Sequence, residues 1–163
     1  MISERKTSSK LFAWSLVAIW MIVIFMFSSQ KASDSAQTSS GFTSWILSLI
    51  TRKMPVFQIQ TMAIKYDFFV RKFAHFTIYT VLGLLVSNAF LHTSVKRKFL
   101  MSALLCISYS ISDEIHQMFV PGRACRLYDI GIDSLGSMVG ILIYFALFYR
   151  LFINEKSNKL TQK

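Results

Sequence analysis

Cysteine is scarce in this sequence and charged residues are depleted. Cys106 lies inside an apolar run and Cys125 in a short polar segment, with no CxxC or Cys/His ligand pattern around either. Neither a disulfide framework nor a zinc site is supported, so we expect both thiols to be unpaired. Charged residues make up 16% of the chain, whereas a soluble domain carries about 25%. This deficit argues against a soluble globular fold.

Hydrophobic residues supply 53% of the 163 residues and are gathered in long runs. That pattern is typical of a protein embedded in lipid. The formal net charge is +10, but the basic residues flank the apolar runs and form no single stripe. We therefore expect no nucleic-acid partner. The partner that the composition predicts is the lipid bilayer.

Four apolar runs predict an all-α membrane protein, a bundle of four transmembrane helices forming one domain over residues 1–163. The predicted spans cover about 11–29, 73–92, 99–120 and 130–153. The first run is longer than the roughly 7–15 apolar residues of a signal peptide, so we expect a retained helix. The turn signal Pro121-Gly122 separates the third span from the fourth.

The segment between the first and second spans is polar and Ser-rich, then amphipathic. Over 40–51, apolar side chains recur at positions i, i+3, i+4, i+7 and i+8, which predicts a short helix with one apolar stripe. A second amphipathic pattern covers 56–71, after Pro55. We expect both helices to lie in the membrane interface.

The distribution of Lys and Arg predicts the orientation of the spans. With the N-terminus inside, the cytoplasmic segments hold ten of the 18 basic residues and two of the eight acids. The remaining eight bases and six acids fall outside. Because basic residues favour the cytoplasmic side, we expect both termini in the cytoplasm.

This orientation brings four polar motifs to the outer level of the membrane. They are Ser28-Ser29-Gln30 at the end of the first span; Lys72, His75 and Tyr79 at the start of the second; Asp113, Glu114, His116 and Gln117 near the end of the third; and Arg126, Asp129 and Asp133 entering the fourth. An acid at the centre of a spanning helix costs about 2.5–3.5 kcal/mol, and less near the end. The acids are therefore expected to face the bundle interior, close to basic residues.

A small-xxx-small pattern in the fourth span predicts close helix packing. Gly136 and Gly140 are four residues apart, and Gly136 shares a helix face with Asp133. A neighbouring helix on this surface would cover Asp133 and keep its carboxylate away from lipid.

The motifs together resemble a known family. The matching stretches are Phe25–Gln30, Arg71–Gly83, Ser112–Arg123 and Asp129–Gly140. In this order, within residues 11–150, they resemble the VanZ-like family of small bacterial membrane proteins. The resemblance implies several transmembrane helices in a bacterial cytoplasmic membrane. Some VanZ-like members are linked to resistance against the glycopeptide teicoplanin, but the resemblance implies a class and no reaction.

Two interpretations of the polar cluster involve no chemical reaction. In the first, four acids neutralise four bases and set the helix register; the acids are Asp113, Glu114, Asp129 and Asp133, and the bases are Arg71, Lys72, Arg123 and Arg126. In the second, the cluster binds a lipid carrying a phosphate or pyrophosphate, such as a lipid-linked cell-wall precursor or a phospholipid. The binding residues would be Ser28, Gln30, Lys72, Gln117, Arg123, Arg126, Asp129 and Asp133.

A third interpretation is a membrane-embedded hydrolase or transferase that acts on a lipid head group. His75 or His116 would be the nucleophile or the acid and base, oriented by Asp113 or Glu114. Alternatively, a divalent cation would be held by Asp113, His116, Asp129 and Asp133. No familiar catalytic motif matches, so the residues identify neither a reaction nor a cofactor.

Overall fold

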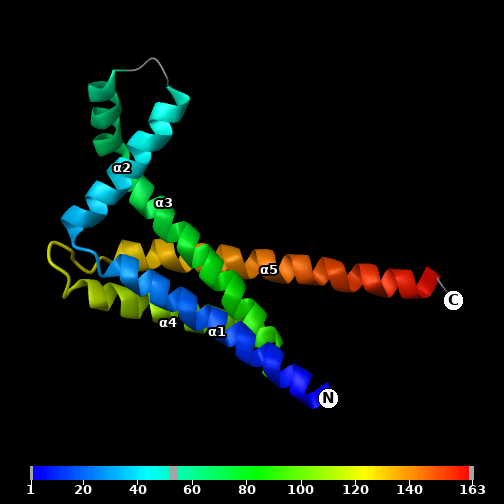
Figure 1. Cartoon of the computed structure of the whole chain (residues 1–163). Helices are drawn as coiled ribbons and strands as arrows, with labels where there is room; N and C mark the ends of the chain where they lie inside the picture. Colours follow the sequence, from blue (N-terminus) through cyan, green and yellow to red (C-terminus); the bar gives the residue numbers. More distant parts are fainter. Residues whose placement is uncertain (1, 52–54, 162–163) are drawn as a thin grey trace.

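The computed structural model describes residues 2–51 and 55–161, with side chains over 8–51 and 55–147. Over these residues the fold is all-α (Figure 1). The helices are α1 (Ile2–Ser28), α2 (Ala32–Ile50), α3 (Val56–Leu91), α4 (Lys98–Gln117) and α5 (Leu127–Thr161). The predicted fold class, an all-α chain, is confirmed.

Three of these helices contain stretches long and apolar enough to cross a membrane: Ser8–Ser28, Val56–Leu91 and Leu127–Leu147. They correspond to the first, second and fourth predicted spans. Large apolar side chains on their outer surfaces, among them Phe12 and Leu142, are more than half exposed. Such a surface suits lipid better than water.

The third predicted span, now α4, is not among these stretches. Asp113, Glu114 and His116 occupy its last turns and lower its mean hydropathy. The four-span bundle is therefore supported for three helices, and the crossing by α4 stays a prediction.

The region between the first two spans differs from the two short helices expected there. α2 begins at Ala32, within the Ser-rich segment. Hydroxyl side chains of this segment donate to carbonyls one turn back, as Ser39 and Thr43 do, and so satisfy their hydrogen bonds within the helix. The second amphipathic stretch is continuous with the second span. After the N-cap residue Pro55, the 36-residue α3 meets no proline or glycine before Gly83, so nothing interrupts the helix.

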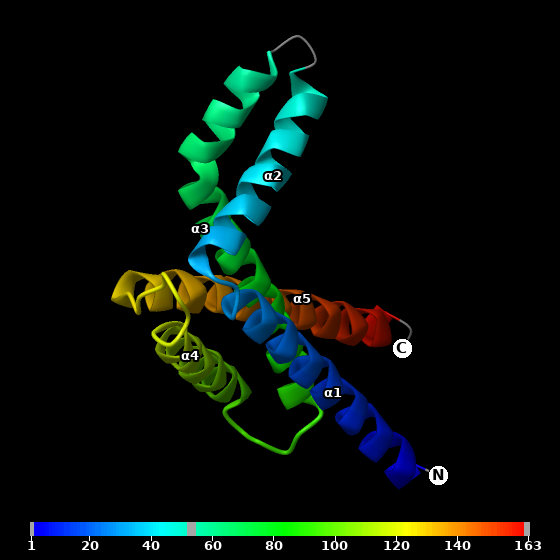
Figure 2. The ribbon, with the colours of Figure 1, turned by 60° about the vertical axis from the view of Figure 1, so that its left-hand side comes forward.

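The length of α3 shapes the molecule. At 1.5 Å per residue it extends about 54 Å, well beyond the roughly 30 Å of a bilayer core. Its first half pairs with α2 in a hairpin that stands away from the other helices, and its second half crosses α5 (Figures 1 and 2). The candidate site residues at the middle of α3 therefore lie where the hairpin joins the bundle.

The interface between α3 and α5 is the most extensive in the fold and depends on glycine. A Cβ added at Gly136 would lie 2.4 Å from the carbonyl oxygen of Phe76, and one at Gly140 would lie 2.0 Å from that of Thr80. Side chains cannot occupy these positions without moving the backbone. The predicted small-xxx-small packing surface is confirmed, and Asp133 beside it is buried.

The remaining helices join the bundle through a buried apolar core, and their interhelical hydrogen bonds include two from aromatic side chains. Trp20 of α1 donates through Nε1 to the carbonyl of Ile78, at 2.8 Å. Tyr109 of α4 donates through its hydroxyl to the carbonyl of Met21, at 2.6 Å. The start of α1, the loop 92–97 and the end of α5 lie at one end of the bundle, and the loop 118–126 lies at the other (Figure 1).

Candidate functional site

The four polar motifs meet at the end of the bundle that carries the loop 118–126 (Figure 1). Their members come from the end of α1, the middle of α3, the end of α4 and the start of α5. The buried ones are Ser28, Tyr79, Asp113, Glu114, Gln117, Asp129 and Asp133. Burial of so many polar groups requires partners within the bundle.

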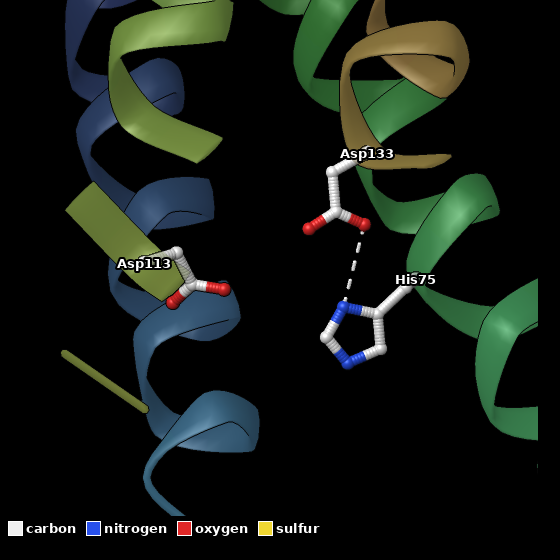
Figure 3. A group of neighbouring side chains, drawn as sticks. All are labelled: His75, Asp113 and Asp133. Atoms are coloured by element: carbon white, nitrogen blue, oxygen red, sulfur yellow. Dashed lines mark ion pairs between the residues drawn. The ribbon is translucent and has the colours of Figure 1, made fainter. Parts of the chain in front are cut away.

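Three side chains from three helices face one common space, as Figure 3 shows. Nδ1 of His75 lies 3.5 Å from Oδ1 of Asp133. A ligand atom from each of His75, Asp113 and Asp133 lies within 4.8 Å of the other two. Asp133 is 1% exposed and Asp113 is 3% exposed. Both oxygens of Asp133 and Oδ1 of Asp113 have no hydrogen-bond partner among the described residues.

Gln117 connects this cluster to the loop 118–126. Its Nε2 donates to the hydroxyl of Ser28 at 2.8 Å and to Oδ2 of Asp113 at 3.4 Å. Its Oε1 accepts from Nη1 of Arg123 at 3.3 Å. Arg123 also donates through Nε to the carbonyl of Gln30, at 2.9 Å. One amide side chain therefore links the end of α1, a buried carboxylate and a loop guanidinium.

A second set of contacts lies at the start of α5. Lys72 forms an ion pair with Asp129, and its ammonium lies 5.0 Å from the centre of the Tyr128 ring. Arg126 donates from Nη1 to the Tyr128 hydroxyl at 2.6 Å. Its backbone N–H donates to Oε2 of Glu114 at 3.0 Å, while Oε1 of Glu114 has no partner in the described part of the chain.

Two adjoining cavities open onto these residues. The polar cavity, of about 200 Å³, is lined chiefly by Arg71, Lys72, His75, Gln117, Arg123, Arg126 and Asp129. The apolar cavity, of about 420 Å³, is lined by residues that include Phe27, Phe42, Val70, Phe73 and Ile78. Arg71, His75 and Arg123 line both cavities. A cationic space next to an apolar one is an arrangement that suits an amphipathic ligand.

The charge of the polar cavity is positive. Arg71 is paired with Asp67 at 2.9 Å and Lys72 with Asp129. Arg123 has no carboxylate in ion-pair distance over the residues described. Burial of its guanidinium and the proximity of Arg71 lower the pKa of Arg123, but an arginine stays protonated at neutral pH.

A model of the VanZ/LLP1 family matches residues 13–150, a range that contains all four motifs. The chain belongs to the VanZ/LLP1 family. No curated protein and no solved structure matches it. The site of this VanZ/LLP1 protein is therefore interpreted from its own geometry.

One interpretation of the sequence places a divalent cation among Asp113, His116, Asp129 and Asp133. In the structure a different histidine, His75, lies beside the acids. His116 lies near the Ser29 hydroxyl at 3.1 Å and stacks on Phe25, with ring centres 4.4 Å apart. Positions i and i+3 of a helix differ by about 60° around its axis. His116 therefore faces α1, Asp129 is paired with Lys72, and His75 of α3 completes the group with Asp113 and Asp133.

Two tyrosines add to the site of the VanZ/LLP1 protein. Tyr128 contacts both Lys72 and Arg126. The sequence does not indicate this role, because a tyrosine at the end of a span is usually an anchor in the membrane interface. Tyr79 shares a face of α3 with His75, as the spacing predicts. It is fully buried, and its hydroxyl has no hydrogen-bond partner within residues 8–51 and 55–147.

Proposed function

We propose that this VanZ/LLP1 protein binds a lipid with a phosphate or pyrophosphate head group, in the outer leaflet of a bacterial cytoplasmic membrane. The observation that carries this proposal is the junction of the two cavities. The polar one offers positive charge at the level of the head group, and the apolar one offers a slot for the lipid chain. Arg71, His75 and Arg123 stand at the boundary between them.

The head group would be held mainly by arginine. A guanidinium presents parallel N–H donors that match two phosphate oxygens, which an ammonium cannot do. Arg126 is exposed at the rim of the polar cavity, and Arg123 lies half-buried inside it. Lys72 would contribute a point charge, although Asp129 already neutralises part of it.

The lipid chain would leave through the apolar cavity. Its wall includes the last turn of α1, a stretch of α2 that contributes hydroxyl side chains and Phe42, and the middle of α3, with Phe27 and Phe73 among its residues. A lipid-linked cell-wall precursor or a phospholipid would fit a site with a cationic cavity for the head group and an apolar cavity for the chain. If the occupant is a wall precursor, the site connects the protein to teicoplanin susceptibility.

The proposal includes four spans with both termini in the cytoplasm. α4 runs between two loops at opposite ends of the bundle, 92–97 and 118–126 (Figure 1). Its acids are covered by neighbouring helices, which removes most of the cost of placing them at membrane depth.

Lipid retention tests the binding proposal. The protein is purified in mild detergent, and co-purified anionic lipid is measured by native mass spectrometry. Arg126→Ala keeps the backbone N–H that Glu114 accepts from, and Arg123→Lys keeps the charge but loses the guanidinium fork. We expect the double variant to lose lipid by about tenfold, the size of one charge-assisted contact.

Arg97→Ala is the matched control, because Arg97 is an exposed arginine in the loop at the other end of the bundle. It should retain lipid as the wild type does. Unchanged retention in the double variant, with an unchanged unfolding midpoint, contradicts the proposal. Susceptibility to teicoplanin, scored beside protein abundance, tests the resistance role separately.

A second candidate function, a hydrolase or transferase acting on the head group, is favoured by the position of His75. The imidazole lines both cavities and contacts a buried carboxylate, Asp133, on its other side. A base oriented by an acid and facing the substrate space is a recurrent catalytic arrangement. Glu114 and His116 are engaged with Arg126 and Ser29 instead.

Release of phosphate from lipid phosphates, with and without Mg²⁺, Mn²⁺ or Zn²⁺, tests the enzymatic candidate. His75→Gln should abolish turnover, and His116→Gln should retain most of it. Wild-type protein that binds lipid phosphate but turns over none argues for binding without catalysis.

A further inference from the structure

The carboxyl groups of Asp113 and Asp133 are buried, so their ionised forms need a counter-charge. Three of their four oxygens have no hydrogen-bond partner among the described residues; the fourth, Oδ2 of Asp113, accepts from Gln117 at 3.4 Å. Ionised carboxylates in such surroundings are costly unless they are paired or coordinate a metal. His75 is the basic side chain that contacts Asp133, and one of its ring nitrogens lies within 4.8 Å of an Asp113 carboxylate oxygen.

The neighbouring basic side chains already interact with other groups. Lys72 is paired with Asp129 and Arg71 with Asp67, while Arg123 reaches Asp113 only through Gln117. Even a protonated His75 would leave one of the two carboxylates without a positive partner. The space between the three side chains, which they face in Figure 3, is therefore suited to an added cation.

The donor set indicates the kind of cation. One imidazole nitrogen and two carboxylates suit Mn²⁺, Fe²⁺ or Zn²⁺, whereas Ca²⁺ and Mg²⁺ prefer oxygen ligands alone. Zinc ligands lie about 2.0–2.2 Å from the ion in a tetrahedral arrangement, so two donors are about 3.3–3.6 Å apart. The donor atoms here lie within 4.8 Å of one another. His75 and Asp133 already have this separation, at 3.5 Å, and side-chain rotations that bring the farthest donors about 1–1.5 Å closer would close the site.

We infer that His75, Asp113 and Asp133 form a binding site for one divalent transition-metal ion. Three protein ligands leave a coordination position for water or for an oxygen of a ligand. Because His75 also lines the polar cavity, this position lies next to the space where an anionic group would bind. The inference does not depend on lipid binding, since the ion is held by the protein side chains alone.

Metal titration of the full chain in detergent tests the inference. The protein is stripped with a chelator, and Mn²⁺ binding is followed by the loss of the free-ion EPR signal, with Zn²⁺ measured in competition. We expect one ion per chain, and a loss of affinity of at least about tenfold in Asp133→Asn and Asp113→Asn. Mg²⁺ and Ca²⁺ should compete only weakly.

Pulsed EPR of bound Mn²⁺ identifies the nitrogen ligand. A nitrogen coupling should be present in the wild type, absent in His75→Gln and present in His116→Gln, the matched control. If the aspartate variants do not fold, the wild-type stoichiometry and the two histidine variants still decide the question. Less than stoichiometric binding by the wild type at about 1 mM metal, unchanged affinity in folded Asp133→Asn, or tighter binding of Ca²⁺ would each overturn the inference.

Discussion

Nδ1 of His75 lies 3.5 Å from Oδ1 of Asp133, across the interface between α3 and α5. This contact exists because the two helices approach each other closely at Gly136, less than one turn after Asp133. A larger residue at Gly136 would separate the helices and the two functional side chains together. Packing and chemistry at this end of the bundle therefore depend on the same backbone contact.

Bound metal should stabilise the protein through this contact. An ion that binds only the folded state adds about 2.7 kcal/mol at a concentration one hundred times its Kd. Adding Mn²⁺ to the metal-free wild type should raise the thermal midpoint by several degrees. Asp133→Asn should show a much smaller rise, and His116→Gln a rise equal to the wild type. Equal rises in Asp133→Asn and the wild type would contradict the assignment.

Alanine at Gly140 should destabilise the bundle. Its Cβ would lie 2.0 Å from the backbone oxygen of Thr80, an atom that cannot move independently of α3. Overpacking of this kind costs about 1–3 kcal/mol. Gly131→Ala on the same helix is the control, because nothing lies within 4 Å of its added Cβ. Thermal unfolding in detergent should separate the two variants, and equal midpoints would disprove the close contact.

The ion pair between Lys72 and Asp129 should show energetic coupling. Lys72→Met leaves the Asp129 carboxylate, which is 10% exposed, without its cation, and Asp129→Asn leaves the ammonium unpaired. The free energies of unfolding lost in the two single variants should together exceed the loss in the double variant. A double-mutant cycle should give a coupling of about 0.5–3 kcal/mol, measured by unfolding in detergent. A coupling near zero would show that the two groups do not interact.

Thiol labelling should decide whether α4 crosses the membrane. Cys125 is partly exposed in the loop 118–126, and Cys106 is buried. In Cys106→Ser, an impermeant maleimide should label Cys125 in intact cells. In a second variant without native thiols, Val95→Cys in the opposite loop should be labelled only after permeabilisation. Labelling of both positions from the same side would show that α4 does not cross.

Much of this arrangement could be predicted from hydropathy and helical spacing. Long apolar runs predict the helices that can span, and Pro121-Gly122 predicts the end of α4; Gly122 has a φ of +77°. The spacing of Gly136 and Gly140 predicts a close helix contact, and the structure identifies α3 as the partner. These features depend on residues that are close along the chain, so short stretches of sequence are enough to predict them.

The sequence by itself determined the all-α fold class and the family motifs. It also determined that the polar residues of these motifs gather at one end of the bundle. Tertiary structure decided which of them meet. Helical periodicity shows that Asp113 and His116 are close along α4, but the rotation of α4 against its neighbours turns His116 to α1 and leaves His75 beside Asp133. The two cavities are likewise set by packing, because each is bounded by helices distant in sequence. Which face of a helix meets which neighbour depends on the whole bundle, and no short stretch of sequence specifies it.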